Sequence, residues 1–180
     1  SGVLVLENEK TALNRGAQIL CEIVGYGATA DAYHLTSPAP EGVGATKSMQ
    51  NALNENNIKK EKIDYINAHG TSTPYNDKNE TIAIKNTFKE HSKSLTISST
   101  KSSTGHLLGA AGAIEAIACI ISINNSFIPP TINLNTSDPD CDLNYNPNHS
   151  INKNVNYAMS NTFGFGGHNA SIIFKKYEQN

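Results

Sequence analysis

A lysine and a histidine stand five positions apart in the segment KSSTGHLLGAAG, residues 101–112. Lys101 directly follows an apolar run, and His106 stands where a long apolar helix is expected to begin. The positive end of that helix would lower the pKa of His106 and keep its imidazole neutral. A neutral imidazole can donate one hydrogen bond to an oxygen, while Lys101 can orient it and supply positive charge to a developing anion. The segment therefore predicts a site that stabilises negative charge.

A second histidine, His69, has a similar setting. It ends the apolar run IDYINAHG, and the small residues of GTSTP follow it. A rigid strand behind the ring and small residues in front of it suit an imidazole that donates a hydrogen bond to an oxyanion. The alternative is a strand-end histidine that bonds only to the backbone.

One carboxylate in the apolar helix needs a partner. Glu115 lies nine residues after His106, among glycine, alanine and isoleucine. Because an unpaired buried carboxylate is costly, we expect either Lys101 or a hydrogen-bonded water beside it. An exposed strip along the helix is the alternative.

A glycine-rich turn, NTFGFGGHN, occupies residues 161–169. Glycine allows a backbone to approach a ligand and to act as a hinge, so a phenylalanine between glycines can serve as a movable gate. A plain tight hairpin would have the same composition.

Alternating strands and helices are predicted to position these groups. Apolar runs predict strands at residues 18–33, 63–68 and 94–100 and paired strands over 157–174, and helical spacing predicts helices at 46–56, 76–88 and 107–123. This order indicates an α/β domain with a mostly parallel sheet layered with helices. Sites in such sheets gather beyond the carboxyl ends of strands, which selects the loops that begin HGTST, KSSTGH and NTFGFGG.

Several local patterns carry further expectations. Asp77 and Glu80 have the spacing of a capping box at the start of helix 76–88. The opening SGVLVLE predicts a strand already in progress, with no secretory signal, so we expect the natural start upstream. Residues 107–123 are short for a bilayer and carry Glu115, so a buried helix is favoured over a membrane span.

Composition argues against several classes of function. A net charge of -2 and a pI near 6.3 give no attraction to nucleic acid or to an anionic membrane. Cys21, Cys119 and Cys141 form no CxxC pair, which indicates neither a disulfide framework nor a zinc knuckle and favours a reducing compartment. His69, His106 and His168 lack metal-ligand spacing, and no GxxxxGK[ST] sequence indicates nucleotide binding.

A strong coding bias bears on the compartment. The chain holds 23 asparagines and 13 lysines against one arginine, as an A+T-rich genome produces. We expect a plastid if the source is an A+T-rich parasite, and otherwise the cytoplasm.

Four segments in this order and spacing, NAHGTSTPYND, SSTKSSTGHLLGAAGAIEAI, IPPTINL and SNTFGFGGHN, resemble the beta-ketoacyl-acyl-carrier-protein synthases of fatty-acid synthesis. GYGATADAYHLTSP and DPDCDLNYNPN are most similar to the synthase II type, with the synthase I type as nearest competitor. The resemblance implies a thiolase-like fold, in which two similar α/β halves form five layers and usually pair as a homodimer. Residues 18–180 would form the carboxy-terminal half, and residues 1–17 the last strand and helix of the amino-terminal half.

The family's chemistry implies roles for the matching residues. A cysteine takes the acyl chain as a thioester, a malonyl group on acyl-carrier protein loses carbon dioxide, and the resulting carbanion attacks the thioester. By motif position, His69 and His106 would donate to the malonyl thioester oxygen, and Lys101 and Glu115 match the lysine and the helix carboxylate of the same site. The resemblance also assigns Thr71 and Thr73 to binding of the pantetheine arm, with Tyr33 and Thr36 in the same entrance. It assigns the Phe165 N–H to the thioester oxyanion hole, and Phe163 with Gly164 to the gating loop.

The family's nucleophile is absent from this sequence. None of the three cysteines stands at a strand-to-helix elbow, so we expect them to serve packing and the chain alone to be inactive in condensation. The expected partners are acyl-carrier protein, the amino-terminal half and a second copy, with no nucleic acid and no membrane. No cofactor is expected beyond the phosphopantetheine that carries the substrates.

Two other functions remain open. One is a non-catalytic binding or dimerisation module, against which the joint presence of His69, Lys101 and His106 argues. The other is a thiolase-fold enzyme acting on coenzyme A thioesters, which HGTST with GHLLGAAG disfavours.

Overall fold

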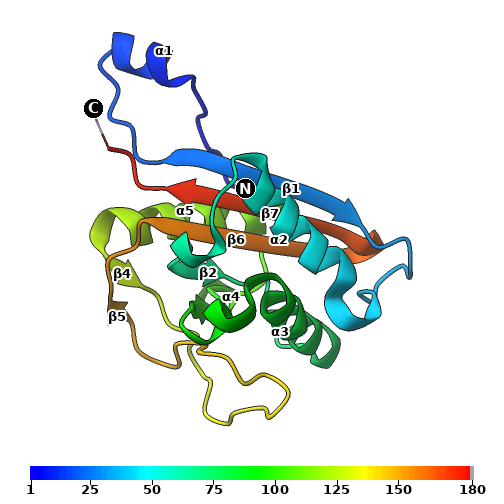
Figure 1. Ribbon diagram of the computed structural model, residues 1–180. Helices are drawn as coiled ribbons and strands as arrows, with labels where there is room; N and C mark the ends of the chain where they lie inside the picture. Colours follow the sequence, from blue (N-terminus) through cyan, green and yellow to red (C-terminus); the bar gives the residue numbers. More distant parts are fainter. Residues whose placement is uncertain (179–180) are drawn as a thin grey trace.

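A mixed sheet covered by helices on both faces forms the body of the molecule. The computed structural model describes residues 1–178, and within them the main sheet has five strands in the order β1-β7-β6-β2-β3 (Figure 1). These strands are β1 Glu22–Ala30, β2 Tyr65–Asn67, β3 Thr96–Ser98, β6 Tyr157–Gly164 and β7 His168–Lys175. β2 runs parallel to β3 and β6, whereas β7 is antiparallel to β1 and β6. The layered α/β prediction is confirmed, but the sheet is mixed rather than mostly parallel, because β7 pairs antiparallel with both of its neighbours.

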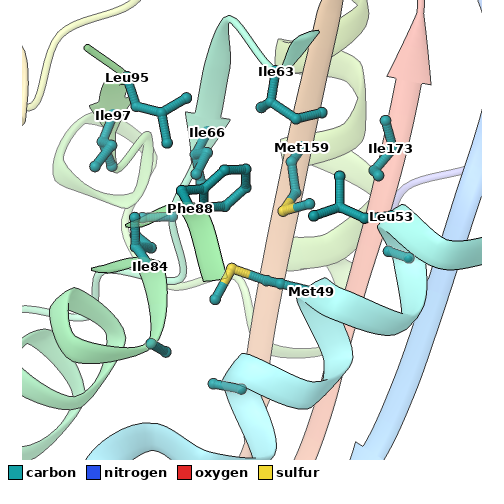
Figure 2. Close-up of a cluster of buried hydrophobic side chains, with 14 residues drawn as sticks. Met49, Leu53, Ile63, Ile66, Ile84, Phe88, Leu95, Ile97, Met159 and Ile173 are labelled. Carbon is teal, nitrogen blue, oxygen red and sulfur yellow. The ribbon is translucent and has the colours of Figure 1, made fainter. Parts of the chain in front are cut away.

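Helices α2 Val43–Glu55 and α3 Pro74–Phe88 cover one face of the sheet (Figure 1). Figure 2 shows the apolar side chains that fill this layer, among them Met49, Leu53, Ile66, Phe88 and Met159. α2 lies directly on β1 because Gly27 has no side chain: a Cβ there would stand 2.0 Å from the Ser48 carbonyl oxygen. The small residues of GYGATA thus bring a helix close to the sheet.

Helix α5 Ala111–Asn125, preceded by the 3-10 turn η4 Leu108–Ala110, covers the other face. Ala116, Cys119 and Ile123 of α5 pack on Tyr65 and Phe174 from the sheet. Residues 108–125 are long and apolar enough to cross a membrane by length and composition alone, and a third of them are buried. The predicted helix forms, but only one of its faces is buried here.

The strand predicted at SGVLVLE does not form, and this expectation is wrong for the described structure. The first elements are the short helix α1 Glu9–Asn14 and then β1, and Val3 and Val5 are each 81% exposed. A strand needs a neighbour to satisfy its backbone groups, and no strand of the described residues lies beside this segment.

Short elements fill the connections. Residues 101–106, expected as a loop, open with the one-turn helix α4 Lys101–Thr104, and β4 Phe127–Ile128 pairs with β5 Ile151–Asn152 in a second small sheet. The remaining 3-10 turns are η1 Pro40–Gly42, η2 Lys60–Lys62, η3 Lys89–Lys93 and η5 Phe165–Gly167.

Candidate active site

Chain segments at the carboxyl ends of the parallel strands meet at one edge of the sheet. His69 lies two residues beyond β2, Lys101 three residues beyond β3, and Phe163 near the end of β6. The His69 and His106 ring centroids are 5.5 Å apart in an edge contact, and those of His69 and Phe163 are 5.9 Å apart. The sequence prediction that these loops converge is confirmed for these residues.

His69 is a buried, neutral histidine. Its side chain is almost enclosed, with the residue 4% exposed, and Nδ1 has no hydrogen-bond partner within residues 1–178. Burial, then the positive charge of Lys101, then His106 lower the pKa of His69 to about 3. At pH 7 this imidazole therefore has one N–H to donate and no charge of its own.

His106 is exposed and also has a lowered pKa. Its Nδ1 accepts a hydrogen bond from the backbone N–H of Leu108 at 3.1 Å, so in the neutral ring Nε2 carries the proton. The predicted direction of the pKa shift was right, but the expected cause was wrong. His106 precedes η4 rather than opening α5, and the shift comes from desolvation and then from Lys101.

Lys101 and Glu115 form a buried ion pair. Their side chains are 5% and 3% exposed, and Lys101 Nζ donates to Glu115 Oε1. Burial raises the pKa of Glu115 in spite of the attraction of Lys101, and its Oε2 has no partner in the described part of the chain. Lys101 was one of the two predicted partners of Glu115, so that expectation is confirmed and the exposed strip is wrong.

Glu80 is a site residue that the sequence interpretation missed. Its carboxylate accepts the backbone N–H groups of His69, at 2.9 Å, and of Gly70, at 2.8 Å, and thereby holds the turn after β2. The predicted capping box is wrong, because the N-cap Thr73 makes no side-chain capping bond and Glu80 points inward. A usable signal was present: Glu80 begins a stripe with Ala83, Ile84 and Thr87, the i, i+3, i+4 and i+7 spacing of a buried helix face.

A cavity of about 600 Å³ opens beside these groups. Thr71, Lys101 and His106 line it, and Thr71 Oγ1 lies 2.9 Å from Thr73 Oγ1. Much of the opposite lining comes from residues 131–147, a segment that entered the sequence analysis only through the family resemblance. The structure thus brings Thr71 to the same cavity as Lys101 and His106, with Thr73 beside Thr71 but outside the lining.

The glycine-rich turn packs on the loop that follows β1 instead. Gly166 N–H donates to the Leu35 carbonyl at 2.7 Å, and Asp31 N–H donates to the Gly167 carbonyl at 2.9 Å. Gly166 and Gly167 have φ of 82° and 74°, which favours glycine at both positions.

Several predicted residues stand at this second contact rather than at the cavity. Phe165 is 77% exposed and Tyr33 60% exposed. Thr36 is also exposed, and its N–H donates to His34 Nδ1 at 3.1 Å. None of these three lines the cavity, and Gly164 is likewise exposed on the turn. The structure therefore places Tyr33 and Thr36 beside the turn of Phe165, and does not place them beside Thr71 and Thr73.

The cysteines do not occupy an activated position. Burial raises the pKa of Cys21 to about 11 and raises that of Cys119 far more. Cys141 lines the cavity, which the sequence did not predict, and desolvation raises the pKa of its thiol as well. Among residues 1–178, no three side chains of His, Cys, Asp or Glu are grouped so as to hold a metal ion.

Comparisons with known proteins give one consistent result. Residues 20–135 match the family model described as the beta-ketoacyl synthase, C-terminal domain. The chain is 56% identical over 178 residues to 3-oxoacyl-[acyl-carrier-protein] synthase 2 of Staphylococcus aureus and 53% identical to the protein of that name from Synechocystis. Each alignment covers 99% of this chain but 43% of the relative, so the chain spans less than half the length of these proteins.

Solved structures agree with the sequence relatives. A beta-ketoacyl synthase from Burkholderia phymatum superposes with a TM-score of 0.90 at 40% identity, covering 96% of this chain and 41% of that one. A type II PKS ketosynthase solved in complex with its acyl-carrier protein gives a TM-score of 0.93 at 38% identity, covering 96% of this chain and 42% of that one.

Proposed function

The chain belongs to the beta-ketoacyl synthase family and has the fold of its carboxy-terminal half, and on that premise we propose that it is the carboxy-terminal part of a 3-oxoacyl-[acyl-carrier-protein] synthase of the synthase II type. The reaction proposed for the whole enzyme is the decarboxylative condensation of an acyl thioester with malonyl-acyl-carrier protein. The nucleophilic cysteine would lie in the amino-terminal half, since no cysteine of this chain has an activated thiol.

The pair of neutral imidazoles, His69 and His106, is the observation that carries this proposal. Their rings are 5.5 Å apart, and the lowered pKa of each keeps an N–H donor without adding a charge. When the bond to the malonyl carboxylate breaks, carbon dioxide leaves and the electron pair moves toward the thioester oxygen. Two donors aimed at that oxygen stabilise the enolate more than the neutral thioester, which accelerates decarboxylation.

The ion pair of Lys101 and Glu115 supports the same step. Lys101 lowers the pKa of both histidines, so it helps to keep them neutral as donors. Glu115 compensates the buried lysine charge and holds its ammonium group in place beneath the site. The enolate carbon then attacks the acyl thioester, and the carbon–sulfur bond to the cysteine breaks to release the thiolate.

The cavity and the glycine-rich turn would receive the substrates. Thr71 lines the cavity and its hydroxyl lies next to that of Thr73, and two adjacent hydroxyls suit the amides of a pantetheine arm. The Phe165 N–H would form the thioester oxyanion hole once the other half is in place. Phe163, which touches His69, would form the gating loop together with Gly164. Tyr33 and Thr36 would line the entrance from the loop that Gly166 contacts.

The proposed partners follow from the same family. Acyl-carrier protein would deliver both substrates on phosphopantetheine, with no other cofactor, as in the related ketosynthase solved with its carrier protein. We assign residues 1–17 to the amino-terminal half, residues 18–180 to the carboxy-terminal half, and a homodimer to the whole enzyme. The proposed compartment is a plastid if the source is an A+T-rich parasite, and otherwise the cytoplasm.

The test uses the polypeptide in which this chain is joined to its amino-terminal half. His69→Ala and His106→Ala should each abolish decarboxylation of malonyl-acyl-carrier protein while the cysteine still accepts an acyl group. His149→Ala, which removes an exposed histidine outside the site, is the matched control and should retain both steps. Decarboxylation at the normal rate in either site variant would overturn the proposal, and equal activity on malonyl-coenzyme A would favour a coenzyme A enzyme.

A further inference from the structure

A buried polar chain leads from the site histidine through the sheet to helix α2. It begins at Glu80, whose two carboxylate oxygens each accept one backbone N–H of the turn after β2. Gly70 in that turn has φ of 40°, a left-handed conformation that glycine adopts readily. Because an ionised carboxylate accepts both bonds and a protonated one has lost part of this capacity, the state of Glu80 bears on where His69 stands.

Asn161 on β6 is the next member of the chain. It is fully buried, and its Nδ2 faces Glu80 Oε1 at 3.4 Å. The orientation of the amide is set from behind, since Ser171 on β7 donates to Asn161 Oδ1 at 2.8 Å. With Oδ1 occupied by that hydroxyl, the amide turns Nδ2 toward Glu80, and the same nitrogen also lies 3.4 Å from Met49 Sδ.

Ser48 on α2 completes the chain without reaching the amide. Its Oγ lies 3.0 Å from Ser171 Oγ and donates to the Ala45 carbonyl at 2.9 Å. The proton of Ser171 is therefore free for Asn161. Ser48 and Ser171 are equally buried serines, of which only one contacts the amide.

We infer that Asn161 and Ser171 are positioning residues for decarboxylation, acting on His69 through the carboxylate of Glu80. Neither touches the cavity. The inference rests on the proposed function. It adds to the site a buried residue of β6 and one of β7 that received no role from the family resemblance.

The charged and titratable groups around Glu80 determine what the loss of Asn161 would do. The backbone N–H of His69 contacts Glu80 just beyond β2. Lys101 on α4 and Tyr145 in residues 131–147 also lie near Glu80, and Asp77 lies one turn earlier on α3. Burial raises the pKa of Glu80, and the two backbone bonds, Lys101 and Asn161 oppose that rise. Removing Asn161 takes away one of the interactions that lower the pKa of Glu80, so Glu80 binds a proton at a higher pH.

The experiment measures decarboxylation of malonyl-acyl-carrier protein against pH in the full-length enzyme. In Asn161→Ala the acidic limb of the profile should move to higher pH by about one unit, as expected for the loss of one hydrogen bond to a charged group. The kcat should fall with KM unchanged. Ser171→Ala should shift the limb by less in the same direction, and Ser48→Ala, the matched control, should leave it in place.

Amide hydrogen exchange supplies a readout that does not depend on activity. The N–H groups of His69 and Gly70 should exchange faster in Asn161→Ala than in Ser48→Ala. Equal losses at every pH in all three variants, with unchanged exchange, would overturn the inference and leave a packing role. If the wild-type enzyme did not decarboxylate malonyl groups, the proposed function would fail, while the exchange of these two amides would still decide the positioning role.

Discussion

Burial of His69 should make the stability of the chain depend on pH in a defined way. The unfolded histidine titrates near its ordinary pKa of 6.5, whereas in the folded chain the pKa is lowered to about 3. Between pH 6.5 and pH 3 the histidine is therefore protonated in the unfolded state and neutral in the folded state. The stability is fully present above pH 6.5 and is lost progressively as the pH falls toward 3.

The size of this loss follows from linkage. Each pH unit below 6.5 costs about 1.4 kcal/mol, so roughly 2 kcal/mol is lost by pH 5. Solvent screening reduces this figure little, because the residue is 4% exposed. The variant His69→Gln has no titrating group at this position, so its stability lacks this pH dependence. The difference in free energy of unfolding, wild type minus variant, should therefore fall by about 2 kcal/mol between pH 7 and pH 5.

The assay is urea unfolding of the 180-residue chain at both pH values, with other titrating groups cancelled by the double difference. His149→Gln, which replaces an exposed histidine, is the control and should show no such change. A wild-type to His69→Gln difference that is the same at both pH values would refute the reasoning, since His69 would then titrate equally in the folded and unfolded chains.

Three further outcomes follow from the packing. Lys101→Met should lower the free energy of unfolding in urea by about 3–5 kcal/mol, because it leaves Glu115 buried without its partner. The double variant Lys101→Met/Glu115→Leu should recover most of that loss. Equal stability of the single and double variants would contradict this prediction. Gly27→Ala should destabilise the chain by roughly 1–3 kcal/mol because its Cβ would stand 2.0 Å from the Ser48 carbonyl, whereas Gly109→Ala, with nothing within 4 Å, should change stability little. Alkylation of the native chain at pH 8 should be slower at Cys21 and Cys119 than in the unfolded chain, since burial raises both thiol pKa values; labelling of native Cys119 at the unfolded rate would count against its buried place in α5.

The parts of the site that the sequence predicted are those fixed by short-range rules. His69 and Lys101 follow strands directly, and parallel strands place such residues at one edge, so their convergence needed no further information. Glu115 needed a partner because its helix neighbours are apolar, and Lys101 was one of the two partners expected for it.

Glu80 shows where short-range rules failed. Its spacing from Asp77 satisfies the capping-box pattern, yet the carboxylate turns to the N–H groups of His69 and Gly70, which lie on another element. The same holds for Asn161, whose role depends on Ser171 across the β6–β7 hairpin. Tertiary partners of this kind cannot be read from a local pattern, because the pattern records only which residues are near in sequence.

Two apolar segments are less buried than their sequences predict, and the proposed function gives one physical explanation for both. The opening SGVLVLE and the outer face of α5 both carry apolar residues in patterns that normally lead to burial. The opening segment is largely exposed in this structure, and the outer face of α5 is only half-buried. The relatives have more than twice the length of this chain, so under the proposed function an amino-terminal half is available to cover apolar surface of this one. A sequence selected in that larger protein retains the apolar patterns of its full set of contacts, so it predicts strands and buried faces that the isolated half cannot satisfy. The same reasoning explains why the histidine pair and the neighbouring ion pair are complete here, since all four residues come from this half. The glycine-rich turn with Phe165 is exposed because, under the proposed function, part of its surroundings belongs to the other half.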